Sequence, residues 1–200
     1  MSKTSQPTGC DDPKSNFLSV DEALQRIRGG LKPIAGFEQV AIRTALGRIL
    51  AEDIRSPINV PAYANSAMDG YAVRSADLPT EGETTLARVG TSYAGEPFAG
   101  EVKAGQAARI MTGAMMPSGA DTVIMQEQVS AEGENVRIGT GHKAGQNVRH
   151  PGEDIAEGQV ILAAGKALNP AELGLLASLG IPEVRIRRRL RVAFFSTGDE

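Results

Sequence analysis

The sequence predicts an α+β protein with more than one domain, in which a small β domain is inserted into an elongated, discontinuous domain of helices and strands. Helix signals occur near both ends of the chain, and short β-like runs fill its middle. A dense apolar run closes the sequence and predicts the first strand of a further α/β domain. The 200 residues allow one or two domains, and 23 Gly with 11 Pro favour turns and short strands over a helical bundle.

Helix signals open the chain. Residues 1–16 are polar, with almost no apolar content, and are expected to form a disordered tail. Ser19 and Glu22 have the spacing of a capping box, which predicts a helix that ends at the glycine pair 29–30.

Two more elements precede the β-rich middle of the chain. Val40–Ile42 is typical of a short strand, and Thr44 suits the N-cap of a second helix that runs to Leu50. We expect these elements, within residues 17–58, to share one domain with residues 151–187, where helical spacing returns.

Residues 59–150 are predicted to form the inserted β domain. Runs that favour strands alternate there with Gly and Pro, at intervals typical of a small β domain. The runs lie at 85–89, 108–111, 122–125 and 135–138.

The last helix is predicted at 170–179. Asn169 suits its N-cap, Pro170 its first position and Glu172 the other half of a capping box, and Gly180 ends it. Its leucines offer more apolar surface than a small domain readily hides, so we expect this helix to contribute to a homodimer.

Residues 188–200 are expected to begin the α/β domain. The run LRVAFFS at 190–196 is typical of a buried parallel strand, which needs helices on both faces of its sheet. A buried strand without its sheet is not a stable ending, so we expect further chain to complete that domain.

Composition excludes several classes of function. The net charge of −3 provides no general attraction to nucleic acid or acidic membranes, and 4% aromatic residues without Trp provide no base-stacking platform. The basic run at 185–191 is interpreted as a solvated strand edge rather than a nucleic-acid patch. No apolar run reaches about 18 residues, the length of a membrane helix. A single cysteine, Cys10, rules out a disulfide framework within the chain and favours a cytoplasmic protein.

Asp69 is the first candidate for chemistry and stands in the segment NSAMDGYA at 65–72. Asp-Gly is a strong hairpin-turn signal, so Asp69 and Gly70 suit a tight turn. The same turn would present a carboxylate from a rigid loop, and the two interpretations are compatible.

Thr112 is the second candidate, in the segment RIMTGA at 109–114. A strand that ends at Thr112 and Gly113 offers a hydroxyl and free backbone N–H groups, which can bind an oxyanion. The alternative is a strand end that is simply capped by the threonine.

The third segment, NVRHPGED at 147–154, combines Arg149 with Asp154. The planar guanidinium of Arg149 suits a phosphate, and Asp154 suits Mg²⁺, which prefers one or two carboxylates together with substrate phosphate. The alternative is a polar loop with local ion pairing. His150 is interpreted as a loop residue, because no second His or Cys lies at metal-ligand spacing.

The fourth segment, STGDE at 196–200, follows the apolar run, where open α/β sheets bind their ligands. Ser196, Thr197 and Gly198 fit phosphate binding, and Glu200 adds a carboxylate. No Ser–His–Asp arrangement can be placed in the chain. Carboxylates and hydroxyls on glycine turns therefore indicate metal and oxyanion handling rather than nucleophilic catalysis.

In this order and spacing, the four segments resemble the molybdopterin molybdenumtransferases, the family that includes the E domain of gephyrin. The segments ALGRILAED at 45–53 and ADTVIMQE at 120–127 are similar to the same family. The resemblance covers residues 18–200, and NSAMDGYA is its most specific segment.

The resemblance implies an elongated dimer whose chains continue with a molybdopterin-binding α/β domain and a C-terminal β barrel. It implies that adenylated molybdopterin and molybdate bind in a cleft between subunits. The adenylate is cleaved with the help of Mg²⁺, and molybdenum is inserted into molybdopterin. Molybdopterin adenylyltransferase is then the upstream partner.

The resemblance also assigns functions to residues of this chain. Asp69, Thr112, Asp154 and Glu200 are the implied catalytic positions, and Asp154 and Glu200 are the implied Mg²⁺ ligands. The implied contacts to the substrate's anionic groups come from Arg149, Ser196, Thr197 and Gly198.

Two departures from the family pattern affect the shape of loops and leave the acidic residues in place. Met115 stands where the family usually has Pro, and His150–Pro151 stands where basic or small residues are usual. Since the family's chains are longer, we expect this chain to be inactive alone. The main alternative is a non-catalytic scaffold or dimerisation module of the same family. A stand-alone carbohydrate- or nucleic-acid-binding β domain is disfavoured by the scarcity of aromatic residues.

Overall fold

The computed structural model describes residues 18–196. The expectations for the tail at 1–16 and for Thr197, Gly198 and Glu200 lie outside the described residues. The described part is α+β, with many strands and few helices, as the sequence predicts. It divides into a large unit, residues 39–186, and a small unit formed by the residues before 39 and after 186.

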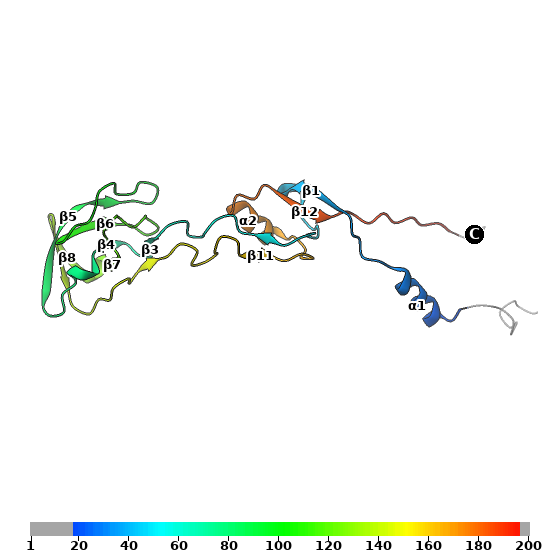
Figure 1. The fold of residues 1–200 in the computed structure, drawn as a ribbon, viewed down its shortest axis with the longest axis horizontal. Helices are drawn as coiled ribbons and strands as arrows, with labels where there is room; N and C mark the ends of the chain where they lie inside the picture. The colour runs from blue at the N-terminus through cyan, green and yellow to red at the C-terminus, as the bar shows by residue number, and fades with distance from the viewer. Residues whose placement is uncertain (1–17, 197–200) are drawn as a thin grey trace, which may run out of the picture. The chain divides into compact units, whose positions relative to one another are not determined.

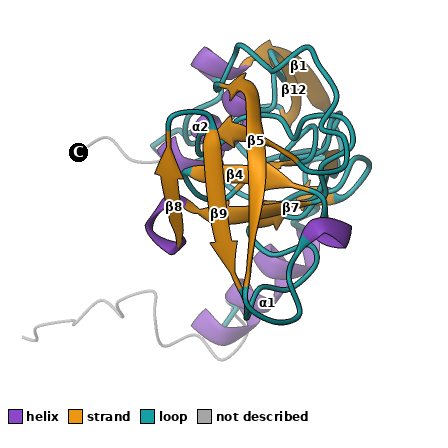
Figure 2. Ribbon diagram, turned by 90° about the vertical axis from the view of Figure 1, so that its left-hand side faces the viewer, coloured by secondary structure: helices purple, strands orange, loops and turns teal. Residues whose placement is uncertain are grey.

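A six-stranded sheet is the main element of the large unit (Figures 1 and 2). Its strand order is β7-β4-β6-β5-β9-β8, in which β5 and β6 run parallel and all other neighbours run antiparallel. The strands are β4 (Gly70–Val73), β5 (Glu83–Ser92), β6 (Gln106–Ile110), β7 (Thr122–Met125), β8 (Val129–Glu132) and β9 (Asn135–Gly139). The predicted runs correspond to β5, β6, β7 and β9.

The strands of this sheet are held together by side chains that are buried in a core. In β9, Val136 and Ile138 are buried between more exposed residues, which is the alternation of a sheet with one face on a core. The inner strand β4 is buried along its whole length. The sheet's buried side chains form two clusters, one around Tyr71, Val73, Leu86, Ala107, Ile124, Val136 and Ile138 and the other around Ala72, Ile110, Ala114 and Val123.

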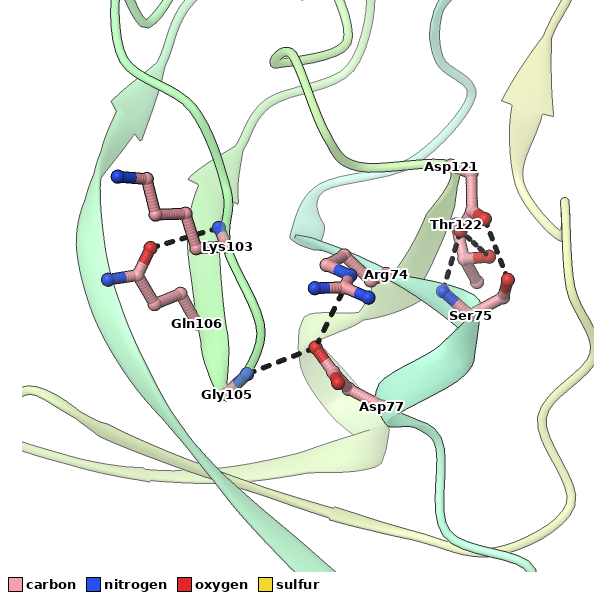
Figure 3. Close-up of polar contacts among 8 residues, drawn as sticks. All are labelled: Arg74, Ser75, Asp77, Lys103, Gly105, Gln106, Asp121 and Thr122. Atoms are coloured by element: carbon pink, nitrogen blue, oxygen red, sulfur yellow. Dashed lines mark hydrogen bonds and ion pairs between the residues drawn. The ribbon is translucent and has the colours of Figure 1, made fainter.

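A short 3-10 helix, η2 (Ser75–Asp77), follows β4 and is tied to the loop before β7 (Figure 3). The Asp121 carboxylate accepts hydrogen bonds from the Ser75 N–H at 2.7 Å, the Ser75 hydroxyl at 2.6 Å and the Thr122 hydroxyl at 2.8 Å. Burial favours the neutral form of Asp121, but these hydrogen bonds outweigh it and lower its pKa. Asp77 accepts from the Gly105 N–H at 3.1 Å and ties the other end of η2 to the turn before β6.

A separate core joins two stretches that are far apart in the sequence. β1 (Phe37–Ala41) pairs with β12 (Glu183–Arg187), and β2 (Ile54–Arg55) pairs with β11 (Val160–Leu162). The core packs α2 (Pro170–Ser178) against these strands. Its buried side chains are Ala45, Leu50, Leu162, Leu168, Leu176, Val184 and Ile186.

Helix α2 begins and ends close to where the sequence predicts, but its leucines are less exposed than expected. The Glu172 carboxylate accepts from the Asn169 N–H at 2.9 Å, and Gly180 follows the helix with a φ of 71°. Leu176 is buried, and Leu173 and Leu175 pack against the same core. The core therefore uses much of this apolar surface, and Leu173 and Leu175, which are only partly buried, leave less of it for a dimer contact than we expected.

The second helix predicted from Thr44 to Leu50 is wrong. Only a 3-10 turn, η1 (Ile42–Thr44), forms, and the Thr44 hydroxyl donates to the Ala41 carbonyl at 2.9 Å instead of capping a helix. Leu50 bridges Ile186 in extended conformation and is fully buried. Burial of Leu50 in the core thus overrides the local helical spacing.

In the small unit, α1 (Val20–Gly30) begins at the predicted capping box, where the Ser19 N–H donates to Glu22 at 2.9 Å. The strand predicted at 190–196 does not form within the described residues, where Phe194 and Phe195 are 95% and 86% exposed. A strand needs a neighbour for its backbone hydrogen bonds, and no described segment pairs with it. Within residues 18–196, no helix is long and apolar enough to cross a membrane.

Candidate functional site

The first three candidate segments converge in the large unit. β3 (Asn65–Ser66) pairs antiparallel with β10 (Val148–Arg149), so the first segment lies along the third. The Ser66 N–H donates to the Ala114 carbonyl at 3.0 Å, which joins the first segment to the second. The residue patterns alone did not predict these pairings between distant segments.

Asp69 is held by Thr112 at the start of β4. The backbone N–H and the hydroxyl of Thr112 both donate to Oδ1 of Asp69, each at 2.7 Å. No hydrogen bond among the described residues engages Oδ2 of Asp69. One oxygen of the half-buried carboxylate is therefore fixed, and the other is available to a ligand or a water molecule.

These contacts set the charge state of Asp69. The Thr112 N–H and hydroxyl lower the pKa of Asp69, partial desolvation opposes them, and the positive charge of Arg109 lowers the pKa further. Asp69 therefore stays ionised to a lower pH than a free aspartate.

The expectation that Thr112 offers free donors to an oxyanion is wrong for this structure. Both of its donors are engaged by Asp69, and the Gly113 N–H donates to the Ser66 carbonyl at 2.8 Å. Thr112 thus orients the candidate carboxylate, and the carboxylate itself takes the place of the expected anion.

The hairpin interpretation of Asp69 and Gly70 is also wrong. β3 and β4 pair with other strands and not with each other. Gly70 lies within β4, and a Cβ atom there would lie 2.0 Å from the Ile124 carbonyl oxygen. A glycine is needed because the neighbouring strand approaches closely, not because of a turn.

Arg149 and Asp154 form an ion pair with each other, as the local-pairing alternative expects. Arg149 Nε also lies 3.7 Å from a Glu153 oxygen, and the hydrogen bond and charge of Asp154 raise the pKa of Arg149 above its ordinary value. His150 is exposed, and its N–H donates to Glu153 at 3.0 Å, which fits a loop residue. Within residues 18–196, no group of three or more His, Cys, Asp or Glu side chains could hold a metal ion.

Of the fourth segment, the structure describes only Ser196. Ser196 belongs to the small unit and is exposed in a stretch without regular structure. Thr197, Gly198 and Glu200 lie outside the described residues.

Arg109 and Gln126 lie beside Asp69 but were not predicted as site residues from the sequence. Arg109 donates to the Gly70 carbonyl at 3.3 Å and to Gln126, and the Gln126 N–H donates to the Asp69 carbonyl at 3.1 Å. Both residues stand in segments that resemble the family, RIMTGA and ADTVIMQE. Their contacts depend on strand pairing, so the residue types alone gave no signal.

The arrangement suits the handling of a polar, charged reactant. It presents one ionised carboxylate with a free oxygen, and on the paired strand β10 it presents a guanidinium. Asn65, directly opposite Arg149, has a buried Oδ1 without a hydrogen-bond partner in the described part of the chain. Buried polar atoms are usually satisfied, so this oxygen is a further candidate for a ligand contact.

Comparison with known proteins gives one consistent result. The family model "MoeA N-terminal region (domain I and II)" matches residues 18–180. The chain is 48% identical over 185 residues to a molybdopterin molybdenumtransferase of Haemophilus influenzae, covering 92% of this chain and 45% of that protein. It is 45% identical over 166 residues to one of a Nostoc species, covering 82% and 38%.

A solved structure supports the same family assignment. The crystal structure of the molybdopterin biosynthesis moeA protein of Pyrococcus horikoshii matches with a TM-score of 0.77 and 35% identity, covering 84% of this chain and 45% of that chain. The chain therefore spans less than half the length of the relatives that it matches.

Proposed function

Because this chain belongs to the family of the MoeA N-terminal region, we propose that it forms the N-terminal part of a molybdopterin molybdenumtransferase. The whole enzyme would insert molybdate into adenylated molybdopterin and cleave the adenylate. The observation that carries this proposal is the ionised Asp69, fixed where three family-like segments meet. Relatives that bear this enzyme name support it.

Asp69 would act at the reacting centre. Since Oδ1 is held by Thr112, Oδ2 can orient a water molecule or take up its proton as the adenylate is cleaved. Its lowered pKa keeps it in the charged form that both tasks need. Thr112 would act through Asp69, by keeping its carboxylate in one orientation.

A Mg²⁺ ion would be held by Asp154 and Glu200. The exposed Asp154 fits this expectation, because Mg²⁺ needs only one or two carboxylates when phosphate oxygens supply the other ligands. The chemistry that such an ion would supply is neutralisation of phosphate charge and polarisation of the bond to be cleaved. Arg149, once released from Asp154, can turn its planar guanidinium to the phosphate. Ser196, Thr197 and Gly198 would add contacts to the substrate.

We also propose the wider architecture that the sequence predicts. Residues 17–58 and 151–187 would form one discontinuous domain, with residues 59–150 inserted as a β domain. The enzyme would work as a homodimer in the cytoplasm, with molybdopterin adenylyltransferase supplying its substrate. One cysteine in 200 residues supports a reducing compartment.

The proposal is tested in a chimera, in which this chain replaces the matching N-terminal part of the Haemophilus influenzae relative. The assay measures cofactor formation from adenylated molybdopterin and molybdate. Asp69→Asn keeps the size of the side chain and one acceptor oxygen, so folding should persist. We expect turnover to fall by about 10²-fold or more, while the chimera stays folded with at most a small decrease in melting temperature.

Asp77→Asn is the matched control, because Asp77 also accepts a backbone N–H but lies at η2. Its turnover should stay within about twofold of the unsubstituted chimera. An inactive chimera that is folded would favour the scaffold alternative. Near-normal turnover of Asp69→Asn would show that the chemistry lies elsewhere.

A further inference from the structure

Arg109 and Gln126 together hold the backbone carbonyls of Asp69 and Gly70, an arrangement that we call the brace. Arg109 lies in β6 opposite Tyr71 of β4, and its guanidinium carbon is 5.1 Å from the centre of the tyrosine ring. Nη1 donates to the Gly70 carbonyl at 3.3 Å, and Nη2 donates to Oε1 of Gln126. One planar group thus joins the backbone of β4 to the first residue of η3 (Gln126–Gln128).

Gln126 completes the brace from the other side. Its backbone N–H donates to the Asp69 carbonyl at 3.1 Å. Its amide nitrogen donates to a Glu127 carboxylate oxygen at 2.9 Å, which leaves Oε1 to accept from Arg109. The carbonyls of Asp69 and Gly70 are therefore both engaged, one by each member of the pair.

We propose that Arg109, together with Gln126, is a positioning residue for Asp69. The Arg109 side chain holds the Gly70 carbonyl and the Gln126 side chain, and the Gln126 backbone N–H holds the Asp69 carbonyl, so that the carboxylate stays where Thr112 meets it. Fixed geometry matters because a misplacement of about 1 Å can cost ~10²-fold in rate. Only the effect on turnover rests on the proposed function, since the brace itself is a property of the fold.

Lysine cannot replace arginine in this arrangement. An ammonium group keeps the charge but lacks the planar fork that spans two separate acceptors. Arg109→Lys therefore separates the geometric contribution from the contribution of charge, whereas Arg109→Gln removes both.

The brace is first tested in residues 1–200 by amide hydrogen exchange. In Arg109→Gln, the N–H groups of Gln126 and Thr112 should exchange about 10-fold faster, because each bonds to a loosened Asp69. The control is Arg137→Gln, which removes an exposed arginine paired with Glu132 in the same sheet. Unchanged exchange at both N–H groups in Arg109→Gln would overturn the proposal.

The effect on turnover is tested in the chimera by a double-mutant cycle. Arg109→Gln and Arg109→Lys should each lower kcat by about 10-fold, with KM within about twofold. In the Asp69→Asn background, Arg109→Gln should cause no further loss, because the residue it positions is already disabled.

The failures of the two proposals can be told apart. Asp69→Asn with normal turnover refutes the proposed function while the exchange result still decides the brace. An equal loss from Arg109→Gln in both backgrounds, or a loss confined to KM, means that Arg109 contacts the substrate itself and overturns the proposal. If Arg109→Gln does not fold, Gln126→Ala removes the exposed acceptor instead and must show the same coupling to Asp69.

Discussion

Gly70→Ala should destabilise the large unit through its contact with β7. The added Cβ would lie 2.0 Å from the Ile124 carbonyl oxygen and 2.9 Å from its carbon. To remove this clash, β4 and β7 would have to separate by about 1 Å, which would disturb the ladder of four residue pairs between them. Overpacking and a weakened buried carbonyl together cost about 3–5 kcal/mol.

The stability lost in Gly70→Ala can be measured as a fall in melting temperature and compared with a matched control. At about 2–4 °C per kcal/mol for a chain of this size, the melting temperature should fall by roughly 6–20 °C. Gly139, at the end of β9, has an ordinary φ, and a Cβ atom added there would meet no other atom within 4 Å. Gly139→Ala should therefore be neutral or stabilise by up to about 1 kcal/mol. A Gly70→Ala protein that melts within about 2 °C of the unsubstituted chain would refute the close-approach argument.

Two further predictions concern stability. The lowered pKa of Asp121 stabilises the fold above its unfolded pKa of about 3.9, and this contribution is lost as pH falls through the folded pKa. The difference in melting temperature between the unsubstituted chain and Asp121→Asn should thus be largest near pH 7 and shrink below about pH 4; a constant difference would contradict it. Leu176→Ala empties a fully buried position and should cost roughly 2–5 kcal/mol in denaturant unfolding, whereas Leu46→Ala, 58% exposed, should cost under about 0.5 kcal/mol. Similar losses at both positions would contradict the assigned core.

Local signals in the sequence predicted the elements that depend on neighbouring residues. Both helices begin at capping boxes, in which Ser19 bonds Glu22 and Asn169 bonds Glu172 three residues later. Such contacts are complete within one turn of chain. The strands β5, β6, β7 and β9 were predicted for a similar reason, since their composition and bounding turns are local features.

Elements that depend on distant partners were not predictable in this way. Leu50 is extended because it bridges Ile186, and the apolar run at 190–196 forms no strand because it has no described neighbour. The reason for glycine at position 70 lies in Ile124 of another strand. At the site, the sequence pointed to Asp69 and Thr112 separately. It did not predict that they bond to each other, because they lie 43 positions apart in the chain.

Strand direction explains why these particular residues meet at Asp69. β4 begins directly after Asp69, and its two neighbours, β6 and β7, both run antiparallel to it. The end of each neighbour therefore lies beside the start of β4. Thr112 comes just after β6, and Gln126 comes just after β7, so each strand delivers one contact to the same residue.

The same geometry determines which sequence changes the site can tolerate. The ends of β6 and β7 are each fixed by their own ladder with β4, so a substitution that keeps both ladders keeps both ends in place. A shift of one residue in the register of β6 would instead place Gly113 where Thr112 now stands and turn Arg109 to the opposite face of the sheet. The buried residue pairs that join β4 to β6 and β7 therefore stabilise the sheet and also orient the Asp69 carboxylate.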